Sequence, residues 1–188
     1  MSDPEAIPTL DAARVRLRRL TAADVPALFA LFSDPEATRY WSHPPFTEVA
    51  QAEDLLRDID RHAAAGDLLE WGIEARDTGA VVGTVTLAAI DRANRHAGIG
   101  YMLARERWGQ GLAREAVERA RTYAVDVLRL LRLEADVDPR NAASLRLLER
   151  LGFEREGLLR ARWRVGGEVQ DSVLLGWLAP GATDPDAV

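Results

Sequence analysis

Residues 96–117 constrain the fold more than any other stretch, because a strand pattern there leads through a glycine turn into an amphipathic helix. The strand is expected over residues 98–104, the turn over 108–111 and the helix from Leu112. Glycines let the backbone approach a ligand closely. A helix N-terminus adds unpaired N–H groups and the positive end of a dipole. The stretch therefore predicts a site for a phosphate or diphosphate. The alternative is a plain corner between a strand and a helix.

The composition excludes several other classes of site. The chain has 188 residues, of which 47% are hydrophobic, and this suits one domain with a full core. It has no cysteine, so disulfides, thiolate metal ligands and a cysteine nucleophile are excluded. His43, His62 and His96 do not lie at metal-ligand spacing, so we expect no metal. The net charge of −6 argues against nucleic-acid binding.

Targeting signals are also missing from the pattern. No run of about 20 apolar residues is present, so we expect no membrane span. The first ten residues carry Asp3 and Glu5 and do not read as a secretory signal. With the missing cysteines, this favours a cytoplasmic protein.

The remaining periodicity predicts an α/β (mixed α+β) protein with one mixed sheet of about seven strands and about four helices. We expect a single domain over residues 1–188, with a core over about 13–178 and loose tails at 1–12 and 180–188. Helices are expected at 21–32, 47–65 (with Thr47 as N-cap), 112–127 and 141–150; strands are expected at 15–20, 69–75, 81–89, 98–104, 131–137, from 153 to a hairpin turn at 166–167, and 169–177.

Two of the expected strand ends point to a common site. The strands ending at Leu103 and Val137 are each followed by a helix, so we expect them to be parallel neighbours. Ligands of α/β sheets bind outside the carboxyl ends of such strands. Asn141 and Ser144 lie one helical turn apart and share a face near that edge. The alternative is that Asn141 or a neighbouring residue caps the helix and Ser144 faces solvent.

Three blocks together resemble the GNAT superfamily of acetyl-CoA-dependent N-acetyltransferases. They are G-Y-M-L with W-G-Q-G-L-A-R-E-A, then D-V-D-P-R-N-A-A-S-L-R-L-L-E-R-L-G-F, then E-R-E-G-L-L-R with G-E-V-Q-D-S-V-L-L. Their order is most similar to the branch of ribosomal-protein N-terminal (alanine) acetyltransferases. The resemblance covers about residues 13–178 and implies the GNAT fold.

The resemblance also implies a set of acetyl-CoA contacts. The loop after the central strand would hold the CoA diphosphate with its amides, and the strand end would meet the pantetheine. Asn141 matches a cofactor-contacting asparagine, and Ser144 matches a serine that protonates the departing thiolate. Leu148 stands where many members have a tyrosine acid. The implied cofactor residues are Met102, Leu103, Arg107, Trp108, Gly109, Gln110, Gly111, Leu112, Ala113, Arg114, Asn141 and Ser144.

The glutamates that act as general base in relatives have no counterpart in this sequence. The positions that carry a glutamate in relatives hold Gly98 and Trp163 here. Glu70, Glu134 and Asp171 lie on expected strands and are candidates, with outward surface carboxylates as the alternative. An amine that arrives deprotonated, or a water relay, would also suffice.

The acceptor side is expected between the first two helices. Tyr40 and Trp41, with Arg39, His43 and Phe46 around them, lie where the fold builds an acceptor wall, and Trp163 is expected to face the same cleft. The alternative is that these aromatics pack the core or a homodimer contact. The resemblance implies a primary-amine acceptor, with a protein N-terminal α-amine first. A small-molecule amine and a noncatalytic acyl-CoA-binding domain are the alternatives.

Overall fold

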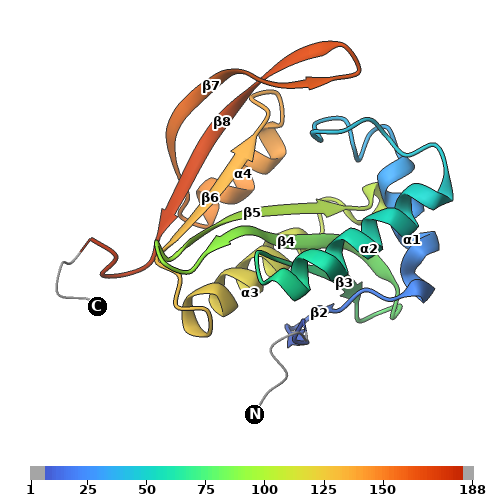
Figure 1. The fold of residues 1–188 in the computed structure, drawn as a ribbon, viewed down its shortest axis with the longest axis horizontal. Coiled ribbons are helices and arrows are strands. Elements are labelled where there is room, and N and C mark those ends of the chain that lie inside the picture. Colours follow the sequence, from blue (N-terminus) through green and yellow to red (C-terminus); the bar gives the residue numbers. More distant parts are fainter. Residues whose placement is uncertain (1–6, 184–188) are drawn as a thin grey trace.

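The computed structural model describes residues 7–183 and has one mixed sheet of eight strands in the order β1-β2-β3-β4-β5-β6-β8-β7 (Figure 1). Neighbouring strands are antiparallel except β5 and β6, which are parallel as expected. The bounds are β1 Leu10–Asp11, β2 Val15–Arg18, β3 Leu68–Ala75, β4 Val81–Asp91, β5 His96–Leu103, β6 Arg132–Val137, β7 Glu154–Val165 and β8 Glu168–Leu178.

The four helices also match the expected order along the chain. They are α1 Val25–Ser33, α2 Val49–Ala65, α3 Leu112–Asp126 and α4 Ala142–Arg150. The expected N-cap at Thr47 is wrong by one residue. Glu48 caps α2 instead, because its extended backbone lets it form a capping box with Gln51.

The helices cover both faces of the sheet. The ring of Trp71 on β3 packs against Tyr123 of α3, with centroids 5.7 Å apart. Glu70, the preceding residue, lines a pocket with Phe32 of α1 and Leu55 of α2. Successive side chains of a strand point to opposite faces. Helices α1 and α2 therefore lie on the face opposite α3.

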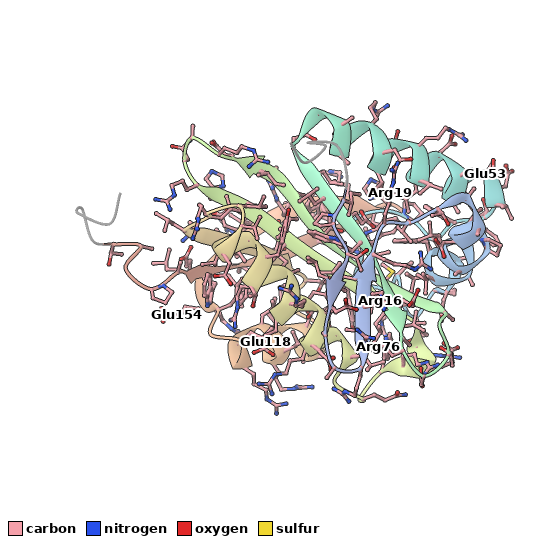
Figure 2. All side chains as sticks on the ribbon, turned by 90° about the horizontal axis from the view of Figure 1, so that it is seen from below. Arg16, Arg19, Glu53, Arg76, Glu118 and Glu154 are labelled. Carbon is pink, nitrogen blue, oxygen red and sulfur yellow. The ribbon has the colours of Figure 1, made fainter. Side chains whose placement is uncertain are left out.

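The expected loose N-terminal tail is wrong for residues 7–12, and residues 1–6 and 184–188 lie outside the described part. Ile7 and Leu10 are buried in the core. Asp11 of β1 accepts hydrogen bonds from Arg16 and Arg76, whose side chains Figure 2 labels. The short edge strand β1 is therefore held by side chains of its neighbours. At the other end, Ala182 N–H donates to the Ala179 carbonyl in a turn.

Strands β5 and β6 separate soon after they pair (Figure 1). Their register runs only from His96 opposite Arg132 to Gly98 opposite Glu134. Beyond this point β5 continues along β4, and β6 continues along β8. The result is a wedge-shaped gap between the carboxyl ends of two parallel strands.

A glycine on β4 lets β5 lie close to it. A Cβ at Gly83 would overlap the backbone oxygen of Met102, whereas a Cβ at Gly100 would meet nothing within 4 Å. We expect Gly83→Ala to lower the free energy of unfolding by about 1–3 kcal/mol, the usual cost of overpacking. Gly100→Ala is the matched control and should change it by less than about 0.5 kcal/mol. Urea unfolding measures both, and equal stabilities would contradict this account.

Candidate active site

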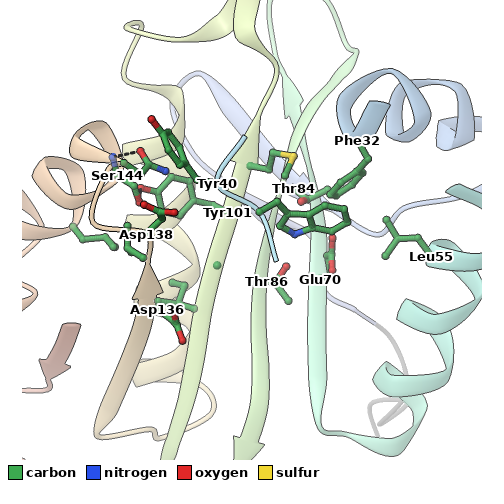
Figure 3. A pocket seen from close by; sticks show the side chains of 17 residues that line it. Phe32, Tyr40, Leu55, Glu70, Thr84, Thr86, Tyr101, Asp136, Asp138 and Ser144 are labelled. Atoms are coloured by element: carbon green, nitrogen blue, oxygen red, sulfur yellow. Dashed lines mark hydrogen bonds between the residues drawn. The ribbon is translucent and has the colours of Figure 1, made fainter. Parts of the chain in front are cut away.

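A pocket opens where β5 and β6 separate, between the α1–α2 loop and α4 (Figure 3). Strands β3 to β6 form its floor, and aromatic side chains form one wall. Its lining residues are Phe32, Tyr40, Trp41, Leu55, Glu70, Thr84, Thr86, Ile99, Gly100, Tyr101, Met102, Asp136, Val137, Asp138, Asn141, Ser144 and Leu148.

A row of three register partners crosses the floor. Glu70 of β3 lies opposite Thr86 of β4, and Thr86 lies opposite Gly100 of β5. Because Gly100 has no side chain and open space above it, the row leaves room beside the carboxyl. A small group held over Gly100 is therefore next to Thr86, with the Glu70 carboxyl beyond it.

Glu70 is a buried carboxyl, with only 8% of the residue exposed. Burial raises the pKa of Glu70 from 4.5 to about 7, although hydrogen bonds with the hydroxyls of Thr86 and Thr84 oppose the rise. The surface alternative is therefore wrong for this residue. An acid whose pKa lies near 7 exchanges protons at neutral pH, as a general base must.

The other two carboxylate candidates do not reach the pocket. Glu134 accepts a hydrogen bond from Arg132 at 2.7 Å, and Asp171 accepts one from the backbone N–H of Ala161 at 2.8 Å. The sequence pattern that distinguishes Glu70 from the other two candidates lies on the neighbouring strand. Thr84 and Thr86 alternate there with apolar residues, which marks a polar strip beside Glu70.

Ser144 and Tyr101 form a hydroxyl pair on the other side of β5. Asn141 Oδ1 accepts a hydrogen bond from the Ser144 N–H at 3.1 Å, so Asn141 caps α4. This part of the alternative reading of the sequence is therefore correct. Ser144 does not face solvent, because its Oγ lies 2.8 Å from the Tyr101 hydroxyl. Burial raises the pKa of Tyr101 to about 12, against the hydrogen bond with Ser144. Both hydroxyls are therefore protonated and available as donors at neutral pH.

Tyr101 was not among the residues expected in the site. It lies 43 positions from Ser144, so no local spacing joins the two. Leu148, which stands at the family's tyrosine position, lines the same pocket but is only 1% exposed and has no polar group.

The glycine turn leads into α3 with its amides free. Gly109 and Gly111 have φ of 72° and 78°, in the left-handed region that glycine tolerates. Within residues 7–183, the backbone N–H groups of 109–114 donate to no protein acceptor, and Glu115 N–H is the first in α3 to do so. Free amides at a helix N-terminus suit an anion, so the geometry is compatible with the expected phosphate site.

Side chains around this turn are held in place by the protein. Arg107 donates to Asp77 at 2.8 Å, and Gln110 Nε2 donates to the Glu106 carbonyl at 3.0 Å. Leu112 is buried under the start of α3, whereas Ala113 and Arg114 are more exposed. The indole of Trp108 donates to the Leu103 carbonyl at 2.7 Å and remains 47% exposed.

The backbone of β5 divides its polar groups between two sides. Ala104 N–H donates to the Val82 carbonyl, on the β4 side. Because these directions alternate along an antiparallel ladder, the backbone groups of Met102 also face β4, and those of Tyr101 and Leu103 face the gap. Met102 contributes its side chain to the pocket instead.

The expected acceptor residues lie in two places. Tyr40 and Trp41 line the pocket, and Trp41 also packs on Phe32 with ring centroids 4.7 Å apart, so it serves both the wall and the core. Trp163 lies on the β7–β8 hairpin outside the pocket. Its indole donates to Asp136, which lines the pocket, at 3.3 Å.

Residues 7–183 contain no group of three or more side chains placed to hold a metal ion. None of the helices in this range is both long and apolar enough to span a membrane.

Comparison with known proteins identifies the class. The model of the acetyltransferase (GNAT) domain family matches residues 14–154. The N-acetyltransferase p20 of Bacillus licheniformis is 39% identical over 163 residues, which are 87% of this chain and 92% of the relative. The chain therefore belongs to the GNAT family and is an N-acetyltransferase.

Two further relatives are a polyamine acetyltransferase and a structure solved with a CoA compound. The spermidine N(1)-acetyltransferase of Escherichia coli K12 is 28% identical over 159 residues, covering 85% of this chain and 83% of the relative. The structure of RimJ from Mycobacterium smegmatis in complex with CoA-disulfide has a TM-score of 0.85 at 26% identity, covering 94% of this chain and 90% of that one.

The raised pKa of Glu70 predicts how stability depends on pH. The folded protein keeps this proton up to about pH 7 and the unfolded chain only to about 4.5, so the buried carboxyl lowers stability as pH rises between these values. Glu70→Gln removes the ionisation. The variant should be more stable than the parent by about 3 kcal/mol near pH 8, an advantage that disappears near pH 4.

Denaturant unfolding at several pH values measures this difference. Glu53→Gln is the control, because Glu53 lies on the exposed side of α2 (Figure 2). It should differ from the parent by less than about 0.5 kcal/mol at every pH. A Glu70→Gln curve that runs parallel to the parent curve would contradict the shifted pKa.

Proposed function

We propose that the protein transfers the acetyl group of acetyl-CoA to a primary amine, by direct attack, and that the amine is the N-terminal α-amine of a protein or peptide. The observation that best supports this proposal is that three features line one pocket: the buried Glu70 carboxyl, the open floor at Gly100 and the Tyr101–Ser144 hydroxyl pair. A proton acceptor, a place for the reacting carbon and proton donors are thus adjacent.

The donor binds across the gap between β5 and β6. The free amides of 109–114 hold its diphosphate at the N-terminus of α3. The backbone of Tyr101 and Leu103, which faces the gap, lies along the pantetheine arm. The likeness to RimJ, whose structure was solved in complex with CoA-disulfide, supports a CoA thioester as the donor.

The reaction then needs two proton transfers. The amine nitrogen attacks the thioester carbon, its proton passes to Glu70, and the carbonyl oxygen becomes an oxyanion next to β5 N–H groups. The C–S bond breaks as the carbonyl re-forms, and the CoA thiolate takes a proton from Ser144. Tyr101, 2.8 Å away, returns a proton to that serine, and solvent carries the proton of Glu70 back to Tyr101. The products are the N-acetyl amide and the CoA thiol.

The charges in the pocket favour an acceptor with one amine. Three carboxylates line the pocket, and two of them already pair with arginine. Asp138 pairs with Arg140 at 2.7 Å, and Asp136 pairs with Arg162 at 3.2 Å. Within residues 7–183, Glu70 has no such partner. It therefore suits a single amine.

The wall beside Glu70 suits an apolar neighbour to that amine. Phe32, Trp41 and Leu55 line this side of the pocket. A peptide that begins with a small or apolar residue presents such a group next to its α-amine. A polyamine such as spermidine, the acceptor named for the Escherichia coli relative, would bring further cations against this wall without partners.

An acceptor panel with labelled acetyl-CoA tests this preference. We expect kcat/KM for peptides with a free N-terminal Ala or Ser to exceed that for spermidine by at least about 100-fold, because each unpaired buried cation costs several kcal/mol. The same peptides with acetylated N-termini are the control and should accept nothing. Faster transfer to spermidine would make the polyamine the acceptor.

Replacing Glu70 separates the base from mere binding. Glu70→Gln should lower kcat/KM by about 10²–10⁴-fold, the usual contribution of a positioned base. In the parent, kcat/KM should rise with pH through about 7 as Glu70 ionises. The variant should lose this rise near pH 7 and keep only the pH dependence that comes from deprotonation of the amine substrate. An unchanged profile would remove Glu70 from the reaction.

The hydroxyl pair gives a graded expectation. Ser144→Ala should lower kcat by roughly 10–10⁴-fold with acetyl-CoA affinity nearly intact, because it removes the donor to the thiolate. Tyr101→Phe should have a smaller effect of the same kind. Calorimetry beside steady-state kinetics measures both. A Ser144→Ala variant that loses only affinity would make Ser144 a positioning residue.

A further inference from the structure

Arg14 connects two parts of the proposed diphosphate site. Its Nη1 donates to the Gln110 carbonyl at 2.7 Å, in the middle of the glycine turn. Its Nε donates to the Glu115 carboxylate of α3 at 3.0 Å. Arg14 immediately precedes β2, 96 positions from Gln110, so these contacts depend on the tertiary fold.

The first contact sets the direction of an amide. The described residues contain no cis peptide, and the C=O and N–H of a trans peptide point in opposite directions. A Gln110 carbonyl held against Arg14 therefore turns the Gly111 N–H away from Arg14. A cationic donor on the carbonyl also polarises the peptide and makes that N–H a stronger donor.

The second contact removes a competing anion. A carboxylate in the first turn of a helix interacts with the same positive end that a diphosphate would use. Glu115 lies in the first turn of α3. Its Oε1 instead accepts from the backbone N–H groups of Arg14 and Val15, at 2.5 and 3.3 Å. The guanidinium of Arg14 neutralises its charge.

We propose that Arg14 is a positioning residue for the acetyl donor: it orients the Gly111 amide and neutralises Glu115, so that the turn accepts a diphosphate. The proposal rests on the proposed use of acetyl-CoA. Arg14 lies away from the pocket that holds Glu70 and Ser144 and contributes nothing to the acyl transfer itself.

The test compares donors with and without a diphosphate. Arg14→Gln should raise KM for acetyl-CoA by about tenfold, the value of one charge-assisted hydrogen bond, with kcat within about twofold. Its kcat/KM for S-acetylpantetheine, which has the thioester and no diphosphate, should match that of the parent. A purely structural loss would affect both donors alike.

A matched control uses a second tie between the N-terminal segment and α3. Arg119 of α3 donates to the Asp11 carbonyl at 3.1 Å and does not touch the glycine turn. Arg119→Gln should leave both donors unchanged. In the double variant Arg14→Gln with Glu115→Gln, part of the affinity for acetyl-CoA should return, because the unpaired carboxylate is gone.

Three results would overturn the role of Arg14: an unchanged KM for acetyl-CoA, an equal loss with S-acetylpantetheine, or an equal loss in Arg119→Gln. Failure of the donor assignment looks different. In that case the parent protein itself would transfer acetyl from neither donor and would bind no CoA in calorimetry.

Discussion

The separation of β5 from β6 is the constraint on which the rest of the site depends. The two strands pair over three residues only, yet each stays regular because another strand holds it: β4 holds β5 to Leu103, and β8 holds β6 to Val137. The gap is therefore fixed by two complete ladders. Backbone groups on its edges still need hydrogen-bond partners. A ligand laid between the strands, parallel to both, supplies them without deforming either ladder.

The alternation of side chains along β5 then places the two proposed proton transfers on opposite faces of the sheet. Gly100 belongs to the row of Glu70 and Thr86, on the face of α1 and α2. Tyr101, the next residue, points to the other face and meets Ser144 of α4. In the proposed reaction, the amine loses its proton on one face and the sulfur gains one on the other. The alternation between two adjacent residues of one strand thus places the proposed base and the proposed acid on different sides of the reacting carbon.

Local patterns sufficed for most of the fold and for the glycine turn, but not for the contents of the pocket. The strands, the helices and the parallel pair were predictable from hydrophobic periodicity and from the order of strands and helices along the chain. Strand β1 was not predicted, because a two-residue strand is too short to show a periodic pattern. The burial of Glu70 depends on α1 and α2 covering β3, and the Tyr101–Ser144 contact joins residues 43 positions apart. Both are tertiary facts. Asn141 shows the converse: its spacing to Ser144 allowed a cap, and the cap is present.

Trp108 adds a chemical bias to the edge of β5. Its indole N–H takes the Leu103 carbonyl, which faces the gap. An edge strand normally offers donors and acceptors in turn. With that carbonyl occupied, the end of the strand offers the Leu103 N–H and no competing oxygen. In the proposed complex, the pantetheine arm that lies along this part of β5 meets an N–H group and no free carbonyl. The tryptophan, half exposed on the glycine turn, therefore links the diphosphate end of the proposed donor site to the polarity of the strand that the pantetheine arm follows.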